Sequence, residues 1–130
     1  MNAGTNQMLH EELTESVLAA CFEVSNELGS GFVESVYEKV LLVALRDKGI
    51  AAEPQISLKV VFRGEIVGDF FADILVEGKL ILELKAVKTL LPEHQAQVIN
   101  YLKATSIRVG LLINFGNPRV EYRRVYNDSA

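Results

Sequence analysis

Two charged side chains interrupt an apolar run in the middle of this sequence. The segment LILELKAV, residues 80–87, reads as a buried strand but contains Glu83 and Lys85. Side chains two positions apart along a strand share a face, so we expect these two charges to project together. Because an unpaired charge in an apolar place is costly, they are either a solvated pair near a strand end or parts of a site.

Asp73 is a further charged residue in an apolar strand pattern. It lies ten residues before Glu83 and across a tight turn, so antiparallel pairing would bring the two carboxylates close together. Two carboxylates and a lysine on one patch suit a hard cation such as Mg²⁺, which takes oxygen ligands and leaves room for a phosphate. Lys85 would then stabilise charge on the phosphate or orient a water. Clustered carboxylates repel, so we expect the pKa of at least one to be raised.

Four other side chains could belong to such a site. Glu34 stands at the start of the core-facing stripe of a predicted helix, although the helix dipole alone would favour an acid there. Gln97 and Tyr101 are one turn apart on another predicted helix and could hydrogen-bond a phosphate or hold the lysine. An amphipathic surface boundary would also place them there. His94, one turn earlier, could approach the same site or simply be exposed at the helix start.

The elements that must position these residues follow from the hydrophobic periodicity. Helical spacing with glycine stops predicts two helices at the N-terminal side. From Ile56 the period becomes two, and glycine-containing connections predict a three-stranded antiparallel meander, with Gly68 marking a bulge. A helix with proline in its first turn follows, then an apolar strand expected to be central and an alternating strand expected at an edge. The predicted ranges are 9–28 and 33–48 for the first helices, 56–62, 65–76 and 79–87 for the meander, 91–105 for the next helix, and 107–115 and 119–127 for the last strands.

Composition sets broad limits on the function. The 130 residues fit a single domain, 1–130, and the net charge of −4 argues against a protein that coats nucleic acid by charge alone. No apolar run is long enough to span a membrane and no signal peptide is recognisable, so we expect no membrane partner. Cys21 is the only cysteine, which excludes an internal disulfide framework and favours a cytoplasmic protein.

The candidate site residues, in their order along the chain, resemble the motifs of the PD-(D/E)XK nuclease superfamily. The sequence resembles more closely the GxxExxY family of small bacterial and archaeal proteins. The resemblance extends over about Leu13 to Tyr126. The proline that the superfamily name suggests before the aspartate is absent here. The matching segments are GFVESVY at 31–37, the strand with Asp73, the E-x-K of Glu83 and Lys85, and the Q-x-x-x-Y of Gln97 and Tyr101.

The resemblance implies a fold and a site. The fold would be α/β, an αβββαβ restriction-endonuclease-like core with a mixed central sheet flanked by helices and preceded by an extra N-terminal helix. The cofactor would be Mg²⁺ or Mn²⁺. The implied metal ligands are Asp73, Glu83, Glu34 and the backbone carbonyl of Leu84, with Lys85 as the catalytic lysine and Gln97 and Tyr101 as its supporting pair.

The leading hypothesis from the sequence is therefore a divalent-metal-dependent nuclease that hydrolyses phosphodiester bonds in DNA. A catalytically silent module with the same fold, binding nucleic acid or protein, is the alternative. The acidic balance and the scattered basic residues, grouped only in RVEYRR at 119–124, favour that alternative. A third hypothesis is a homo-oligomer in which an exposed strand edge pairs with a second copy.

Overall fold

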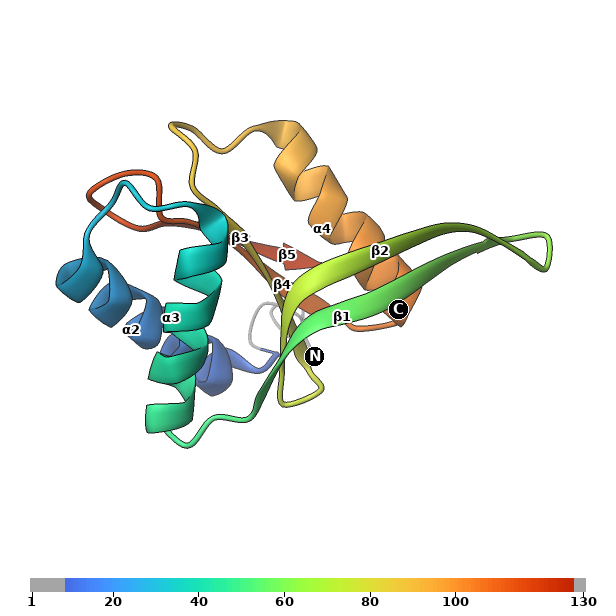
Figure 1. Ribbon diagram of the computed structural model, residues 1–130. Coiled ribbons are helices and arrows are strands. Elements are labelled where there is room, and N and C mark those ends of the chain that lie inside the picture. The colour runs from blue at the N-terminus through green and yellow to red at the C-terminus, as the bar shows by residue number, and fades with distance from the viewer. Residues whose placement is uncertain (1–8, 128–130) are drawn as a thin grey trace.

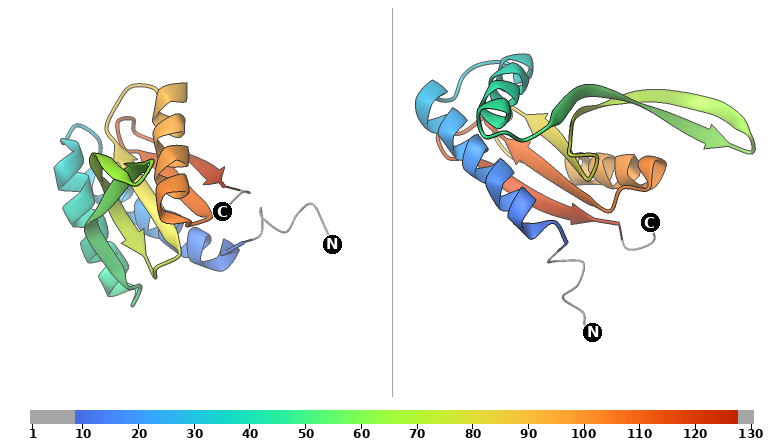
Figure 2. Two further views of the ribbon diagram at one scale, coloured as in Figure 1. Left: turned by 90° about the vertical axis from the view of Figure 1, so that its right-hand side faces the viewer. Right: turned by 90° about the horizontal axis from the view of Figure 1, so that it is seen from below.

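A mixed five-stranded sheet separates two helical layers in the computed structural model, which describes residues 9–127. Helices α2 and α3 cover one face of the sheet and α4 covers the other (Figure 1). The two views of Figure 2 show the same layers from the side and from below. In chain order the elements are α2 (Glu11–Leu28), α3 (Glu34–Asp47), β1 (Ala52–Phe62), β2 (Glu65–Val76), β3 (Leu80–Lys85), α4 (Pro92–Thr105), β4 (Val109–Asn114) and β5 (Glu121–Tyr126).

The sheet topology confirms the α/β fold predicted from the sequence. The strands lie in the order β1-β2-β3-β4-β5; β3 and β4 are parallel, and every other neighbouring pair is antiparallel. A parallel pair needs a crossover connection, and α4 supplies it. All six residues of β4 are buried because helices cover both faces of the sheet there, whereas β5 is an edge strand, as predicted.

Two hydrophobic cores lie on the two faces of β3. Leu80, Leu82 and Leu84 point into the core under α2 and α3. Ile81 points into the smaller core under α4. Since side chains alternate along a strand, Glu83 and Lys85 also project toward the α4 side. No helix within residues 9–127 is long and apolar enough to cross a membrane.

The β1–β2 hairpin leaves the sheet and projects as a long ribbon (Figure 1). Strand β2 pairs with β3 only over residues 74–76 and then continues with β1 alone. Gln55 has a left-handed backbone, φ 53°, between the paired positions Pro54 and Ile56, at the start of the projecting part. We call residues 56–72, the part of the hairpin beyond this point, the arm.

The arm ends in the two-residue turn that the sequence predicted. Arg63 and Gly64 have φ values of 52° and 82°, the pair of positive angles required for a type I′ turn, whose twist matches that of the strands. The register shifts between Val60, which pairs with Gly68, and Val61, which pairs with Ile66, so Val67 is the extra residue and the predicted bulge lies directly beside Gly68.

Several strand boundaries differ from the predicted ones, and two of the differences have a clear physical reason. Strand β1 begins at Ala52 rather than at the predicted Ile56. Its first residues lie on a solvent-exposed edge and show no apolar alternation, so the hydrophobic pattern does not reveal them. Strand β3 ends at Lys85 rather than Val87, because the side chain of Asn114 takes the backbone N–H and C=O of Val87 out of the ladder.

Candidate active site

The candidate site forms at the fork where β2 separates from β3. The last paired positions are Ile74 and Leu82, and Asp73 and Glu83 follow directly beyond them. The carboxylate of Asp73 accepts a 2.7 Å hydrogen bond from the backbone N–H of Leu84. A side chain therefore replaces the backbone partner that β3 loses when β2 leaves. Because the N–H and C=O of one strand residue point to the same side, the carbonyl of Leu84 also faces the fork.

Glu83 is buried with incomplete hydrogen bonding. It is 5% exposed, and its Oε1 has no hydrogen-bond partner, the one such buried side-chain atom found between residues 9 and 127. Its Oε2 lies 3.8 Å from Nζ of Lys85, which is itself mostly buried. Glu83 and Lys85 therefore project together, as their spacing predicts, but they are not a solvated pair at a strand end.

The carboxyl groups of Asp73 and Glu83 both have raised pKa values. Burial is the largest cause for Glu83, whose pKa rises to about 8, and repulsion by Asp73 adds to it. Burial also raises the pKa of Asp73, to about 6, against the hydrogen bond from Leu84; repulsion by Glu38 and Glu34 contributes. The expected rise in pKa is present, but burial rather than repulsion is its main cause.

Glu34 lies at the rim of the site. It is the first residue of α3 and its side chain is exposed, yet its charge helps to raise the pKa of both Asp73 and Glu83. The expectation that Glu34, Asp73 and Glu83 form one three-acid cluster is not met. Between residues 9 and 127 no group of three or more acidic, histidine or cysteine side chains is placed to hold a single metal ion.

Glu38, which was not predicted as a site residue, raises the pKa of Asp73 more than Glu34 does. Its carboxylate accepts a 2.8 Å hydrogen bond from the side chain of Gln55, the residue directly before the arm. Glu38 lies one turn after Glu34 on the same helix stripe, so the helical spacing could have identified it.

Gln97 and Tyr101 lie over the carboxylates from the α4 side. Burial raises the pKa of Tyr101 to about 12, with repulsion by Glu83 and Asp73 as further causes and a hydrogen bond from Gln97 opposing them. These electrostatic interactions indicate that Tyr101, with Gln97 hydrogen-bonded to it, lies near the two carboxylates at the fork. A groove of about 810 Å³ runs from this pair between α4 and the arm, with Phe70 on its other wall. The ring of Phe70 lies 6.3 Å from that of Tyr101.

The turn that leads to Glu34 is held by Tyr37. Its hydroxyl donates a 2.6 Å hydrogen bond to the carbonyl of Gly29 and accepts one of 3.3 Å from the backbone N–H of Phe32. Its buried ring stacks on Phe115 at 4.7 Å. Gly31 has a φ of 110°, which L side chains rarely adopt. The G-x-x-E-x-x-Y pattern thus contains one glycine for the backbone, one structural tyrosine and one acid at the rim.

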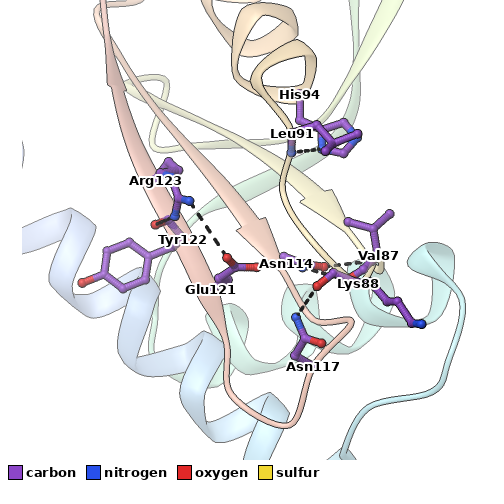
Figure 3. A network of polar contacts seen from close by, with 9 residues as sticks. All are labelled: Val87, Lys88, Leu91, His94, Asn114, Asn117, Glu121, Tyr122 and Arg123. Carbon is purple, nitrogen blue, oxygen red and sulfur yellow. Dashed lines mark hydrogen bonds and ion pairs between the residues drawn. The ribbon is translucent and has the colours of Figure 1, made fainter.

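A buried polar network fixes the segment between Lys85 and α4 (Figure 3). The amide of Asn114, fully buried, accepts hydrogen bonds from the backbone N–H groups of Val87 and Gly116 and donates to the carbonyl of Val87 and the carboxylate of Glu121. A Cβ at Gly116 would overlap the backbone of Val87, so only glycine fits there. Asn114 lies directly beside Lys85 in the sheet and anchors the chain that follows it.

His94 lies in the first turn of α4. Its Nδ1 accepts a 3.0 Å hydrogen bond from the backbone N–H of Leu91, which caps the start of α4 (Figure 3). The histidine therefore satisfies a helix terminus.

Comparison with known proteins gives a family and a fold. A family model described as "PD-(D/E)XK nuclease superfamily" matches residues 11–125. A solved structure described as "Crystal structure of SSO0001" is similar in fold, with a TM-score of 0.55 and 17% identity. That similarity covers 95% of this chain but only 61% of the other. No curated protein matches the sequence.

Proposed function

Because this chain belongs to the PD-(D/E)XK nuclease superfamily, we propose that it is a divalent-metal-dependent nuclease that hydrolyses phosphodiester bonds in DNA. The observation that carries the proposal is the buried, unpartnered Oε1 of Glu83 beside the carboxylate of Asp73. A buried carboxylate oxygen without a donor is costly, and a cation satisfies it.

The donors at the fork fit Mg²⁺ or Mn²⁺. Asp73 and Glu83 supply carboxylate oxygens and Leu84 directs a backbone carbonyl to the same side. Mg²⁺ is commonly held by one or two carboxylates and keeps several waters, so a third acid is not required. When bound, the cation supplies positive charge that polarises the phosphate and lowers the pKa of water.

Lys85 is the proposed catalytic lysine. Its ammonium lies on the same face as Glu83 and is mostly buried, so its interaction with a phosphate oxygen would be weakly screened by water. The hydrogen bond between Gln97 and Tyr101 orients both side chains beside the carboxylates, where they would hold the phosphate or the lysine. The groove between α4 and the arm offers room for a nucleic acid strand next to this pair.

Glu34 is proposed to act from the rim of the site. Its exposed carboxylate adds negative charge that draws a cation toward the fork, and it would orient a water there. We also propose that the chain belongs to the GxxExxY branch of the superfamily. The positive φ of Gly31 and the hydrogen bonds of Tyr37 support this, because both set the start of the helix that carries Glu34.

The proposal is tested by nuclease assays on labelled DNA and RNA, single- and double-stranded, with Mg²⁺, Mn²⁺ or EDTA. We expect metal-dependent cleavage of DNA, lowered on the order of 10²–10³-fold in Lys85→Ala, the usual effect of losing one charge-stabilising group. Lys48→Ala is the matched control, because that lysine forms an exposed ion pair with Glu23. Equal activity in folded Lys85→Ala and wild type would exclude the proposed site.

A catalytically silent module that binds nucleic acid or protein is the second candidate. The lack of a three-acid group among the described residues favours it. Calorimetry with Mg²⁺ separates the two functions. Binding that is lost in Asp73→Asn supports the enzyme, whereas no binding at millimolar metal supports the module.

A further inference from the structure

The arm exposes an unusual concentration of apolar side chains. Of the large hydrophobic residues exposed on the described part of the chain, about half lie within residues 60–71. Their exposures range from 37% to 65%. The arm residues concerned are Val60, Val61, Phe62, Ile66, Val67, Phe70 and Phe71.

The apolar area that the arm exposes lies at the upper end of the range for a monomer. An aromatic side chain carries about 150–250 Å², so the three half-exposed phenylalanines leave on the order of 300 Å² in water. The four aliphatic side chains bring the arm to several hundred Å². The largest apolar patch of a typical monomer is about 300–600 Å², and a standard interface buries about 800 Å² per partner. Summed over both faces of the ribbon, the apolar side chains of the arm thus reach the upper end of the monomer range, and backbone pairing at the open edges would add to the area buried in an interface.

Both strand edges of the arm are open. Strand β1 is the outermost strand of the sheet, and β2 has no partner other than β1 over residues 65–72 within the described structure. Proteins usually protect such edges with charges or proline. On β1 the arm carries only Lys59, whose charge is already paired with Asp69 at 2.9 Å.

The charges of the arm give its outer surface, which faces away from the groove beside α4, no preference for a nucleic acid. Two basic residues, Lys59 and Arg63, balance two acidic ones, Glu65 and Asp69, so its net charge is zero. Binding to a polyphosphate needs an excess of basic groups. A second arm, in contrast, brings an equally apolar and neutral surface, and its own open edges match for antiparallel pairing around a twofold axis.

From these observations we propose that the arm is a dimerisation surface, in which two copies of this chain pair their β1–β2 arms. Pairing removes the open edges and buries the exposed arm side chains that lie outside the groove, which are Phe62, Ile66, Val67 and Phe71. The groove between α4 and the arm lies on the inner side of this surface, so each arm keeps its contact with the site of its own chain. The proposal does not depend on nuclease activity.

Light scattering coupled to size-exclusion chromatography tests it. We expect wild type to elute with twice the mass of the 14.4 kDa chain. Val67→Asp places an unpaired carboxylate in the interface and should raise the dimer dissociation constant about tenfold or more. Val43→Asp, the same change at an exposed valine of α3, should leave it unchanged. A monomeric wild type at all concentrations, or equal dimerisation of both variants, would overturn the proposal.

A cross-linking variant covers the case in which Val67→Asp does not fold. Cys21 is buried, so Val67→Cys carries a single accessible thiol per chain. A short bis-maleimide should then convert the protein to covalent dimers, while Val43→Cys should remain uncross-linked. Equal cross-linking of the two variants would contradict the proposal, as would binding of a monomer to lipid vesicles through Val67.

Discussion

The carboxylate of Asp73 and the backbone N–H of Leu84 are joined by a 2.7 Å hydrogen bond at the point where the β2–β3 ladder ends. The end of the ladder and the candidate site are therefore one feature of the molecule. Where β2 separates from β3, backbone groups of β3 lose their strand partners. The carboxylates of Asp73 and Glu83 and the ammonium of Lys85 lie at this same place. Asp73 stabilises the opened geometry while keeping its second oxygen available.

The stability of the metal-free protein should fall as the pH rises. The pKa of Glu83 is about 8 in the folded chain, above the ordinary glutamate value of about 4.3 in the unfolded chain. The folded state therefore holds this proton more tightly, so the contribution to stability is complete below the ordinary value and is lost as the pH passes about 8. Urea unfolding in EDTA should show a loss on the order of a few kcal/mol across this range.

Glu83→Gln removes the carboxyl group with the highest pKa and should weaken that dependence, leaving the smaller part that Asp73 contributes up to about pH 6. Glu12→Gln, on the exposed face of α2, is the control and should retain it. Added Mg²⁺ should raise the stability of the wild-type protein at high pH but should not raise that of Glu83→Gln. A wild-type stability independent of pH in EDTA would show that the carboxyl group is not buried as described.

Tyr37→Phe should destabilise the protein by about 1–2 kcal/mol, because it removes two hydrogen bonds and leaves the stacked ring in place. Chemical denaturation measures the change. Tyr122→Phe, at a partly exposed ring, should cost far less. If the hydroxyl of Tyr37 were dispensable, the two variants would unfold at the same denaturant concentration.

Asn114→Ala should cost about 3 kcal/mol, since it leaves buried backbone groups of Val87 and Gly116 without partners. Asn117→Ala removes one exposed hydrogen bond to the carbonyl of Lys88 and should cost less than about 1 kcal/mol. Thermal and urea unfolding compare the two. A cost for Asn114→Ala no greater than that for Asn117→Ala would contradict the anchoring role.

The thiol of Cys21 should be unreactive in the native protein. It is fully buried in α2, and burial raises its pKa to about 12, so almost no thiolate forms at neutral pH. A thiol-specific colorimetric reagent should react with one equivalent per chain in denaturant and hardly at all without it. Rapid reaction of the folded chain would mean that α2 separates from the sheet easily.

Much of the fold could be predicted because local patterns and tertiary packing agree in most elements. The apolar stripes of α2 and α3 and the alternation in β2 each identify a face that the structure buries. The start of β1 could not be predicted, because its residues face solvent and their strand conformation depends on pairing with β2. The projection of the arm was also not predictable, since alternation does not reveal which strand pairs end early.

Site residues could be predicted from the sequence where a charged residue interrupts the apolar pattern of a strand. Glu83 and Asp73 are conspicuous for that reason, and the structure places them together. Glu38 and Asn114 were missed. Glu38 stands on a helix where an acid needs no explanation, and the importance of Asn114 depends on a loop of residues 86–91 that approaches it only in the folded chain.

Strand β3 is connected to its two neighbouring strands by chain segments of very different length. It joins β2 through a short turn, but it meets β4 only after the whole of α4 has been traversed. Contacts between near segments form sooner than contacts across long loops. During folding, the two acids and the lysine should therefore meet while they are still hydrated, and α4 should dehydrate them only when it closes over the sheet.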